Sequence, residues 1–257
     1  MNVVLNGCNG KMGVVLTNVI SETEDSRVIA GIDRNPKKLD KNYPIYKDIW
    51  DMEEKIDVII DFSHHSNLKS LLDYGVKKNI PLVIATTGFS EEDEKLIEVA
   101  SKNIPILYSR NMSLGINILV DLTKRMASLL GETFDIEIIE KHHSTKADAP
   151  SGTASMIADE INNSLNNTKN YVFGRKGDEE LRTKDQIGIH SIRGGTMSGE
   201  HIVLFAGLDE MIEIKHTAIT RNIFGVGAIK GAKFIINKKN GLYSMNDIFT
   251  SMENKEK

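Results

Sequence analysis

The chain has 257 residues, a formal net charge of −4 and a single cysteine, Cys8. That length allows one or two domains with a buried core. The basic residues are scattered along the sequence, so we expect no nucleic-acid partner. One cysteine excludes an internal disulfide and an all-cysteine zinc site. These properties favour an enzyme that acts on a small molecule and binds no metal.

The opening sequence gives no sign of export. It reads MNVVLNGCNGKMG and has neither a basic leader nor a cleavage site for a secretory signal. No run of about 18 apolar residues follows, so we expect no membrane-spanning helix. A cytoplasmic location is therefore predicted.

The first half of the chain alternates between short apolar runs and segments with helical spacing. The apolar runs lie at 2–5, 28–32, 57–62, 81–87 and 104–109. Such runs are typical of strands covered by helices on both faces. Between them, 67–78 and 90–100 have the spacing of amphipathic helices. The alternation predicts an α/β fold with a Rossmann-like, doubly wound parallel sheet.

The pattern changes after residue 112. The sequence of 114–130 predicts one long amphipathic helix. Gly131, a typical C-cap residue, marks its end. Helical spacing returns at 224–237, although glycines weaken it. The polar segments 162–170 and 174–185 are predicted to be surface loops. Strand-like runs, which predict an open mixed sheet in an α+β domain, lie at 134–143, 187–195, 200–207 and 211–220.

A glycine-rich segment, GCNGKMG at 7–13, follows the first predicted strand. Glycines there permit a tight turn and a close approach of backbone N–H groups to a pyrophosphate. Asn9 stands where the G-x-G-x-x-G pattern has its second glycine. Lys11 is not followed by Ser or Thr, which excludes a Walker A loop. Asp33 lies 20 residues beyond Gly13, where a carboxylate commonly holds the adenine ribose, so a dinucleotide site is favoured over a plain turn.

Two cations leave the choice of dinucleotide open. A carboxylate at the end of the second strand favours a free 2′-hydroxyl, whereas Arg34 and Lys11 could hold a 2′-phosphate or be plain surface charges. We expect both NADH and NADPH to be used. The loops ATTG (85–88) and SRNMS (109–113) also follow strands and are expected near the nicotinamide half.

The segment EKHHSTKADAPSGTA, at 140–154, concentrates polar and charged side chains where a strand is followed by a helix. Pro150 disfavours helix at the residue before it, and Ser151 or Thr153 can cap the helix that follows. The N–H groups, hydroxyls and dipole of such a helix start favour an anion. A substrate carboxylate is the simplest candidate.

The same segment supplies charge and protons. Lys146 is a compact cation, and His142 or His143 titrates near neutral pH. A bound carboxylate with a proton donor beside it suits reduction by hydride. A metal site with Asp148 is an alternative, but adjacent histidines on a strand point to opposite faces. A purely structural loop with a capped helix is another alternative.

The chain resembles the 4-hydroxy-tetrahydrodipicolinate reductase family, also called dihydrodipicolinate reductases, from residue 1 to about 250. The segments that carry the resemblance are GCNGKMG, ATTGF, NMSLGIN, IEIIEKHHSTKADAPSGTA, GEHIVLF and IEIKHTAITR, in that order. The resemblance implies NADH- or NADPH-dependent reduction of a small cyclic dicarboxylate, with loss of water, in the diaminopimelate route to lysine. It also implies a homotetramer. It implies a dinucleotide-binding domain at 1–112, a substrate-binding and tetramerisation domain at 113–222, and a segment, 223–257, that returns to the first domain.

The resemblance also implies roles for single residues. His142 and Lys146 would be the acid/base pair, with either as the proton donor. The substrate would contact His143, Ser151, Gly152 and Thr153. The residues implied to line the cofactor are Gly7, Cys8, Asn9, Gly10, Lys11, Met12, Asp33, Arg34, Ala85, Thr86, Thr87, Ser109, Arg110, Asn111 and Met112.

Two other functions stay open from the sequence. One is a different nicotinamide-dependent reductase of a small carboxylate substrate; a cysteine-nucleophile semialdehyde enzyme is disfavoured because Cys8 lies in the glycine turn. The other is a non-enzymatic regulator that senses a dinucleotide and has no need of a His142–Lys146 pair.

Overall fold

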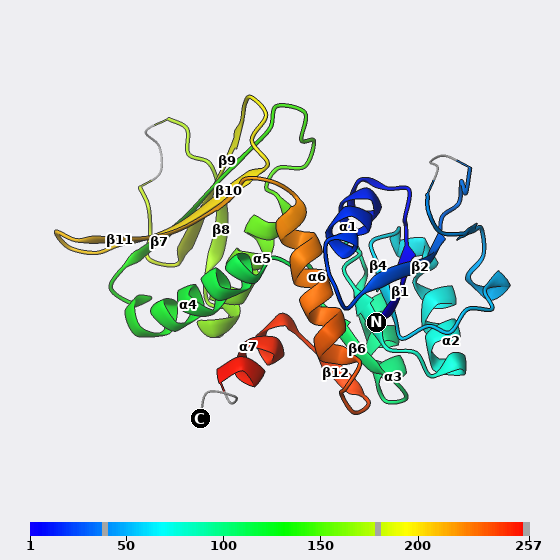
Figure 1. The fold of residues 1–257 in the computed structure, drawn as a ribbon. Helices are drawn as coiled ribbons and strands as arrows, with labels where there is room; N and C mark the ends of the chain where they lie inside the picture. Colours follow the sequence, from blue (N-terminus) through cyan, green and yellow to red (C-terminus); the bar gives the residue numbers. More distant parts are fainter. Residues whose placement is uncertain (38–40, 178–180, 254–257) are drawn as a thin grey trace. The chain divides into compact units, whose positions relative to one another are not determined.

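The computed structural model describes residues 1–37, 41–177 and 181–253 (Figure 1). The chain divides into two compact units. Unit 1 comprises Met1–Leu114 and Arg221–Lys257, and unit 2 comprises Gly115–Thr220. Unit 1 is therefore built from two separate stretches of chain, with unit 2 inserted between them.

Unit 1 contains a seven-stranded sheet in the order β12-β6-β5-β4-β1-β2-β3. Every neighbouring pair is parallel, which confirms the predicted doubly wound sheet. The direction of strand addition reverses between β1 and β4, and ligands bind at this point in such sheets. The strands are β1 (Asn2–Asn6), β2 (Arg27–Ile32), β3 (Ile45–Tyr46), β4 (Val58–Asp61), β5 (Leu82–Ile84), β6 (Pro105–Tyr108) and β12 (Gly241–Tyr243).

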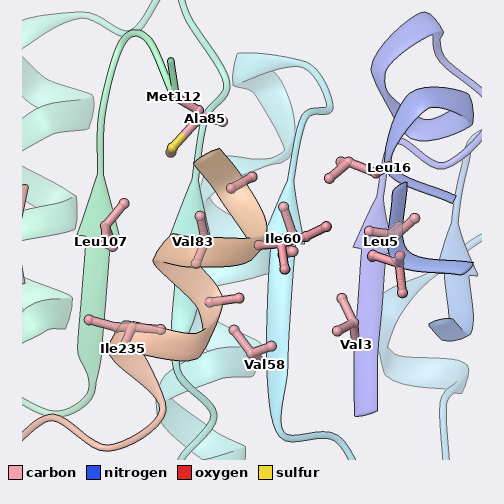
Figure 2. Close-up of a cluster of buried hydrophobic side chains, with 14 of the residues drawn as sticks. Val3, Leu5, Leu16, Val58, Ile60, Val83, Ala85, Leu107, Met112 and Ile235 are labelled. Carbon is pink, nitrogen blue, oxygen red and sulfur yellow. The ribbon is translucent and has the colours of Figure 1, made fainter. Parts of the chain in front are cut away.

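Helices cover both faces of this sheet. Helices α1 and α6 pack on one face and α2 and α3 on the other. Because side chains alternate along a strand, Leu5 faces the first pair and Val4 the second. Figure 2 shows α6 crossing the strands that carry Leu107, Val83 and Ile60. The helices and 3₁₀ turns of unit 1 are α1 (Lys11–Ser21), η1 (Ile49–Asp51), η2 (His65–Asn67), α2 (Leu68–Lys78), α3 (Glu91–Ser101), α6 (Asn222–Ile235) and α7 (Met245–Glu253).

Unit 2 contains a five-stranded mixed sheet in the order β11-β10-β7-β9-β8. Strand β7 is antiparallel to β10 and parallel to β9. Helices α4 (Leu114–Leu130) and α5 (Gly152–Ser164) pack on one face around Ile138, Ile157 and Phe205. We call this the covered face and the opposite one the open face. The strands are β7 (Asp135–His142), β8 (Asn170–Phe173), β9 (Gln186–Arg193), β10 (Gly199–Ala206) and β11 (Met211–Ala218).

Of the two segments predicted as loops, 162–170 is partly regular, whereas the described residues of 174–185 form neither helix nor strand. Residues 162–164 form the last turn of α5, and 170–173 form β8. Strand β8 lies at the sheet edge and reads NYVF, an apolar run too short to show a periodic pattern. Within 174–185, residues 178–180 lie outside the described residues. Strands β3 and β12 have 2 and 3 residues, which is too short for a periodic pattern.

None of the helices in the described residues is both long enough and apolar enough to cross a membrane.

Candidate active site

The glycine turn between β1 and α1 is packed so closely that two of its positions exclude a side chain. Gly7 has φ +83°, and a Cβ there would lie 2.6 Å from the Phe62 carbonyl oxygen. A Cβ on Gly13 would lie 2.3 Å from the Cys8 carbonyl oxygen. No side chain caps the start of α1 at Gly10. The turn therefore brings backbone N–H groups and a helix N-terminus to one place, as an anion requires.

Asn9 joins this turn to the end of β2. It is 3 % exposed, and its backbone N–H donates to Asp33 Oδ2 at 3.0 Å. Its side-chain Nδ2 donates to the Asn35 carbonyl oxygen at 2.8 Å, and the Asn35 N–H donates to Asp33 Oδ1 at 2.9 Å. The departure from the glycine pattern is thus a structural link that fixes Asp33 beside the turn.

A pocket of about 370 Å³ lies next to Asp33 and the glycine turn. Lys47, His64 and Arg34 also line it. The Arg34 guanidinium donates to Ser66 Oγ, so this cation is held at the wall of the pocket. Pockets at the carboxyl ends of parallel strands are where this type of sheet binds nucleotides.

Asp61 is a buried carboxylate that ties the ends of three strands together. It is 2 % exposed and accepts hydrogen bonds from Asn6 Nδ2 at 2.8 Å and Thr86 Oγ1 at 2.7 Å. Burial raises the pKa of Asp61, although these hydrogen bonds act to lower it. The Ser63 N–H donates to Thr86 Oγ1 at 2.9 Å. Asp61 therefore fixes the loops after β4 and β5; its signal in the sequence is a carboxylate at the end of an apolar run.

Several side chains predicted to line a cofactor point elsewhere. Cys8 is 0 % exposed, and burial raises the pKa of its thiol to about 11. Ala85 and Met112 belong to the same core as Cys8. Only the backbone of these residues can face a ligand. By contrast, Lys11 and Thr87 are exposed.

The loop after β6 is held by its own side chains. Ser109 Oγ donates to the Asn111 carbonyl oxygen at 2.7 Å, and Asn111 Oδ1 accepts from the Ser113 N–H at 2.8 Å. Arg110 is exposed and pairs with Glu94 at 3.4 Å. The backbone of 109–113 is therefore fixed at the edge of the sheet where ligands bind.

In unit 2, the end of β7 and the start of α5 form a second polar cluster. Ser151 caps α5 by accepting from the Ala154 N–H at 3.2 Å, which confirms the predicted cap. Its hydroxyl also lies 3.0 Å from His201 Nε2, and its N–H donates to Glu140 at 3.1 Å. A Cβ on Gly152 would meet no atom within 4 Å. The approach to the first turn of α5 is therefore open, whereas Ser151 itself is engaged inside the protein.

His142 is almost buried and lies against Glu140. Its exposed fraction is 8 %, and its Nδ1 lies 2.5 Å from Glu140 Oε2. Burial lowers the pKa of His142, although Glu140 opposes that shift. Burial alone would raise the pKa of Glu140, but hydrogen bonds from Arg193 and His142 lower it to about 2. The pair is therefore an ionised carboxylate and a ring held neutral near pH 7.

Lys146 and His143 are half-buried in the turn after β7. Lys146 Nζ donates to both carboxylate oxygens of Asp148, at 2.7 and 2.8 Å. His143 Nδ1 lies 2.8 Å from Thr145 Oγ1. The lysine thus already binds a carboxylate in the geometry that an anionic ligand would use. Among the described residues, no group of three or more His, Cys, Asp and Glu side chains is arranged to hold a metal ion.

Three members of this cluster have no role in the sequence analysis: Glu140, Arg193 and His201. Strand alternation gives a signal for Glu140, because residues 140 and 142 share one face of β7. Arg193 and His201 come from neighbouring strands, where Arg193 pairs with His142 and His201 with Glu140. That register depends on the tertiary fold, so one sequence does not reveal it.

Comparison with known proteins identifies the family. Family models described as the N-terminus and the C-terminus of dihydrodipicolinate reductase match residues 1–112 and 115–249. The 4-hydroxy-tetrahydrodipicolinate reductase of Caldanaerobacter subterraneus subsp. tengcongensis is 52 % identical over 96 % of this chain and 98 % of its own. The enzyme of the same name from Clostridium tetani is 46 % identical over 98 % of each chain.

Solved structures agree on the fold. Dipicolinate-bound dihydrodipicolinate reductase from Paenisporosarcina sp. TG-14 has a TM-score of 0.76 and 24 % identity, over 95 % of this chain and 97 % of its own. A myo-inositol dehydrogenase from Corynebacterium glutamicum has a TM-score of 0.61 and 13 % identity, over 94 % and 90 %. The predicted resemblance is confirmed: this chain belongs to the dihydrodipicolinate reductase family of oxidoreductases.

Proposed function

We propose that the chain reduces 4-hydroxy-tetrahydrodipicolinate to tetrahydrodipicolinate, with loss of water, in the diaminopimelate route to lysine. The names of its relatives support this function. The observation that carries it is the cluster at the end of β7, where His142 and Lys146 adjoin the open start of α5. A dicarboxylate there would meet a cation, a helix N-terminus and a titrating ring.

A nicotinamide dinucleotide fits unit 1, and it would supply the hydride. The left-handed backbone at Gly7 and the uncapped start of α1 suit a pyrophosphate, and the pocket beside Asp33 suits the adenine ribose. We expect contacts from the backbone of 7–12 and of the loops after β5 and β6. The residues proposed to line the cofactor remain Gly7, Cys8, Asn9, Gly10, Lys11, Met12, Asp33, Arg34, Ala85, Thr86, Thr87, Ser109, Arg110, Asn111 and Met112.

We infer that both NADH and NADPH are used. The carboxylate of Asp33 can accept from a ribose 2′-hydroxyl but repels a 2′-phosphate. Arg34 and Lys47 line the same pocket and would offset that repulsion. The ratio of kcat/KM for the two cofactors measures the balance.

Lys146, Gly152, Thr153 and His143 are proposed to bind the substrate. A substrate carboxylate would replace the contact that Asp148 now makes with Lys146. Ser151, also predicted as a substrate contact, supports the site by capping α5.

His142 or Lys146 would give the proton that accompanies hydride addition to ring C4. In the free protein, burial favours the neutral ring of His142. A bound dicarboxylate adds negative charge nearby, which favours the protonated ring. The site would then become an acid when its substrate binds.

An activity assay tests this function. The substrate is made in situ from pyruvate and aspartate semialdehyde, and oxidation of NADH or NADPH is followed. Turnover that depends on both precursors supports the proposal. Turnover only with other small carboxylates would show a different reductase, and cofactor binding without any turnover would show a dinucleotide-sensing regulator.

A variant locates the substrate site. Lys146→Met should lower kcat/KM by orders of magnitude, because the cation that pairs with a substrate carboxylate is lost. NADH affinity, measured by fluorescence titration, should stay unchanged. An equal loss of NADH affinity would place Lys146 in the cofactor site instead.

We also propose a cytoplasmic homotetramer assembled through unit 2. Light scattering after size exclusion tests the assembly, since a tetramer of this chain has four times the mass of 28.6 kDa.

A further inference from the structure

Glu140 receives hydrogen bonds from three separate segments of unit 2. Its exposed fraction is 0 %. Both terminal nitrogens of Arg193, from β9, donate to it at 2.7 Å, and the Ser151 N–H donates at 3.1 Å. His142, on the same strand, contacts it through Nδ1 at 2.5 Å. A buried carboxylate with this many donors has one orientation and keeps its negative charge.

This carboxylate decides which nitrogen of the His142 ring carries hydrogen. An ionised carboxylate only accepts hydrogen bonds, so Nδ1 must be the donor. In the neutral ring the hydrogen then sits on Nδ1, and Nε2 has a free lone pair. A Cβ on Gly199 would lie 2.9 Å from Nε2. Glycine at 199 therefore leaves room around the nitrogen that can exchange a proton.

We propose that Glu140, clamped by Arg193, is a positioning residue that holds His142 with Nδ1 bonded and Nε2 available to the substrate. The inference rests on the proposed function, in which His142 exchanges a proton with the substrate. The proton moves between Nε2 and the substrate, and Glu140 neither gains nor loses one. Arg193 also donates to the Asp148 carbonyl oxygen, so the same clamp fixes the turn that carries Lys146.

The charged groups around His142 act on its protonation in opposite directions. Burial lowers its pKa, Glu140 raises it, and Lys146 and Arg193 lower it. His201 of β10 stacks edge-on at 5.2 Å, and burial lowers its own pKa to about 3, so it adds no charge near pH 7. Of these four groups, Glu140 alone favours the protonated ring. Its removal should therefore make His142 a weaker base.

The test is a Glu140→Gln variant studied by NMR with ring-¹⁵N histidine. In the natural protein we expect His142 to carry its hydrogen on Nδ1 when neutral, with its signals assigned through His142→Gln. In Glu140→Gln we expect a mixture of tautomers and a pKa lower by about one unit or more. The high-pH midpoint of kcat/KM should move down by the same amount, while KM for NADH stays constant.

Glu137→Gln is the matched control. Glu137 lies on the open face of the same strand and has the same kinds of partner, His190 at 2.7 Å and Arg175 at 2.9 Å. Its removal should leave the His142 tautomer and the kcat/KM midpoint unchanged. A loss of stability in both variants with no change in tautomer would show that Glu140 is merely structural.

The wild-type measurement decides the proposal even if Glu140→Gln does not fold. A hydrogen on Nε2 in the neutral ring would overturn it directly. The double variant Glu140→Gln with Arg193→Met removes the buried cation together with its carboxylate and serves as a second route to the same readout. If the natural protein reduces no substrate, the proposed function fails, whereas the NMR result still shows whether Glu140 sets the tautomer.

Discussion

At the scale of single residues, Asn9 and Asp33 depend on one another. The Asn9 N–H donates to the Asp33 carboxylate, and a second N–H, from Asn35, fixes its other oxygen. Asp33 also lines the pocket next to the turn, and a carboxylate can accept further hydrogen bonds there. Asn9, which stands where the G-x-G-x-x-G pattern has its second glycine, thus holds in place the carboxylate proposed to contact the ribose.

Asp33→Asn should shift cofactor preference toward NADPH. The variant keeps the size of the side chain but removes its negative charge. That charge repels a 2′-phosphate of NADPH and strengthens the hydrogen bond from the 2′-hydroxyl of NADH. Such a charged hydrogen bond is worth about 1.5–3 kcal/mol, so the NADH to NADPH ratio of kcat/KM should fall about tenfold or more. Asp48→Asn is the control, because Asp48 lines the same pocket but its carboxylate caps η1 by accepting from the Trp50 N–H at 3.1 Å. Equal effects of the two variants would contradict a specific role for Asp33.

Cys8 should be unreactive while unit 1 is folded. Its thiol is fully buried and its pKa is raised to about 11, so almost no thiolate exists at pH 7. A disulfide reagent such as DTNB should label it slowly in the native protein and at once in guanidinium chloride. Rapid labelling of the native protein would show that the glycine turn opens readily.

At the scale of elements, α6 positions the loop after β6. A Cβ on Gly227 would lie 1.7 Å from the Met112 carbonyl oxygen, so the helix touches the backbone of 109–113. The C-terminal stretch of unit 1 therefore fixes a loop that belongs to the N-terminal stretch. This contact explains why residue 227 is a glycine.

Gly227→Ala should destabilise unit 1 by about 1–3 kcal/mol, as overpacking typically does, and should weaken NADH binding by moving the 109–113 loop. Gly231→Ala on the same helix is the control. Its Cβ would lie 3.4 Å from Leu107 Cδ1, an ordinary contact, and alanine improves helix propensity by up to about 1 kcal/mol. Denaturant unfolding and NADH titration of both variants test this. Equal stabilities would show that the loop yields without cost.

Elements with local signals could be predicted from the sequence. Helix α4, which ends next to Gly131, has the predicted bounds, and α3, which begins with the Ser90–Asp93 capping box, is displaced by one residue. Strand β8 gives no such signal, because it has 4 residues at the sheet edge, too few for a periodic pattern. In the site, His142, Lys146 and the Ser151 cap lie in one segment and were found together. Arg193 could not be found, since only the pairing of β7 with β9 brings it to Glu140.

At the scale of the whole molecule, the buried carboxylates of the two units have pKa shifts of opposite sign. In unit 2 the pKa of Glu140 and that of Glu200 are lowered to about 2, and that of His201 from 6.5 to about 3. All three lowered values mean that the unfolded chain binds more protons, so these groups lose their stabilising contribution as the pH falls. In unit 1 the raised pKa of Asp61 has the reverse sign: its contribution is present at low pH and lost as pH rises through the folded pKa.

Acid should therefore weaken unit 2 first. The His201 contribution fades as pH falls below 6.5, and the two carboxylate contributions fade below 4.5. Trp50, the only tryptophan, lies in unit 1, so its fluorescence reports that unit while circular dichroism reports both. Denaturant transitions by the two probes should separate increasingly between pH 7 and pH 4, with circular dichroism changing first. Coincident transitions throughout that range would contradict the prediction.

The split construction of unit 1 has a consequence for synthesis on the ribosome. When residue 220 has been added, all of unit 2 has been synthesised. Unit 1 still lacks helix α6 and the edge strand of its sheet, β12. Ala228, Ala232 and Ile235 belong to one of its two cores, so that face is only partly covered, by α1, until α6 emerges. The inserted unit can thus fold before the unit that surrounds it in sequence, and the parallel sheet of unit 1 is completed only after residues 222–243 have emerged.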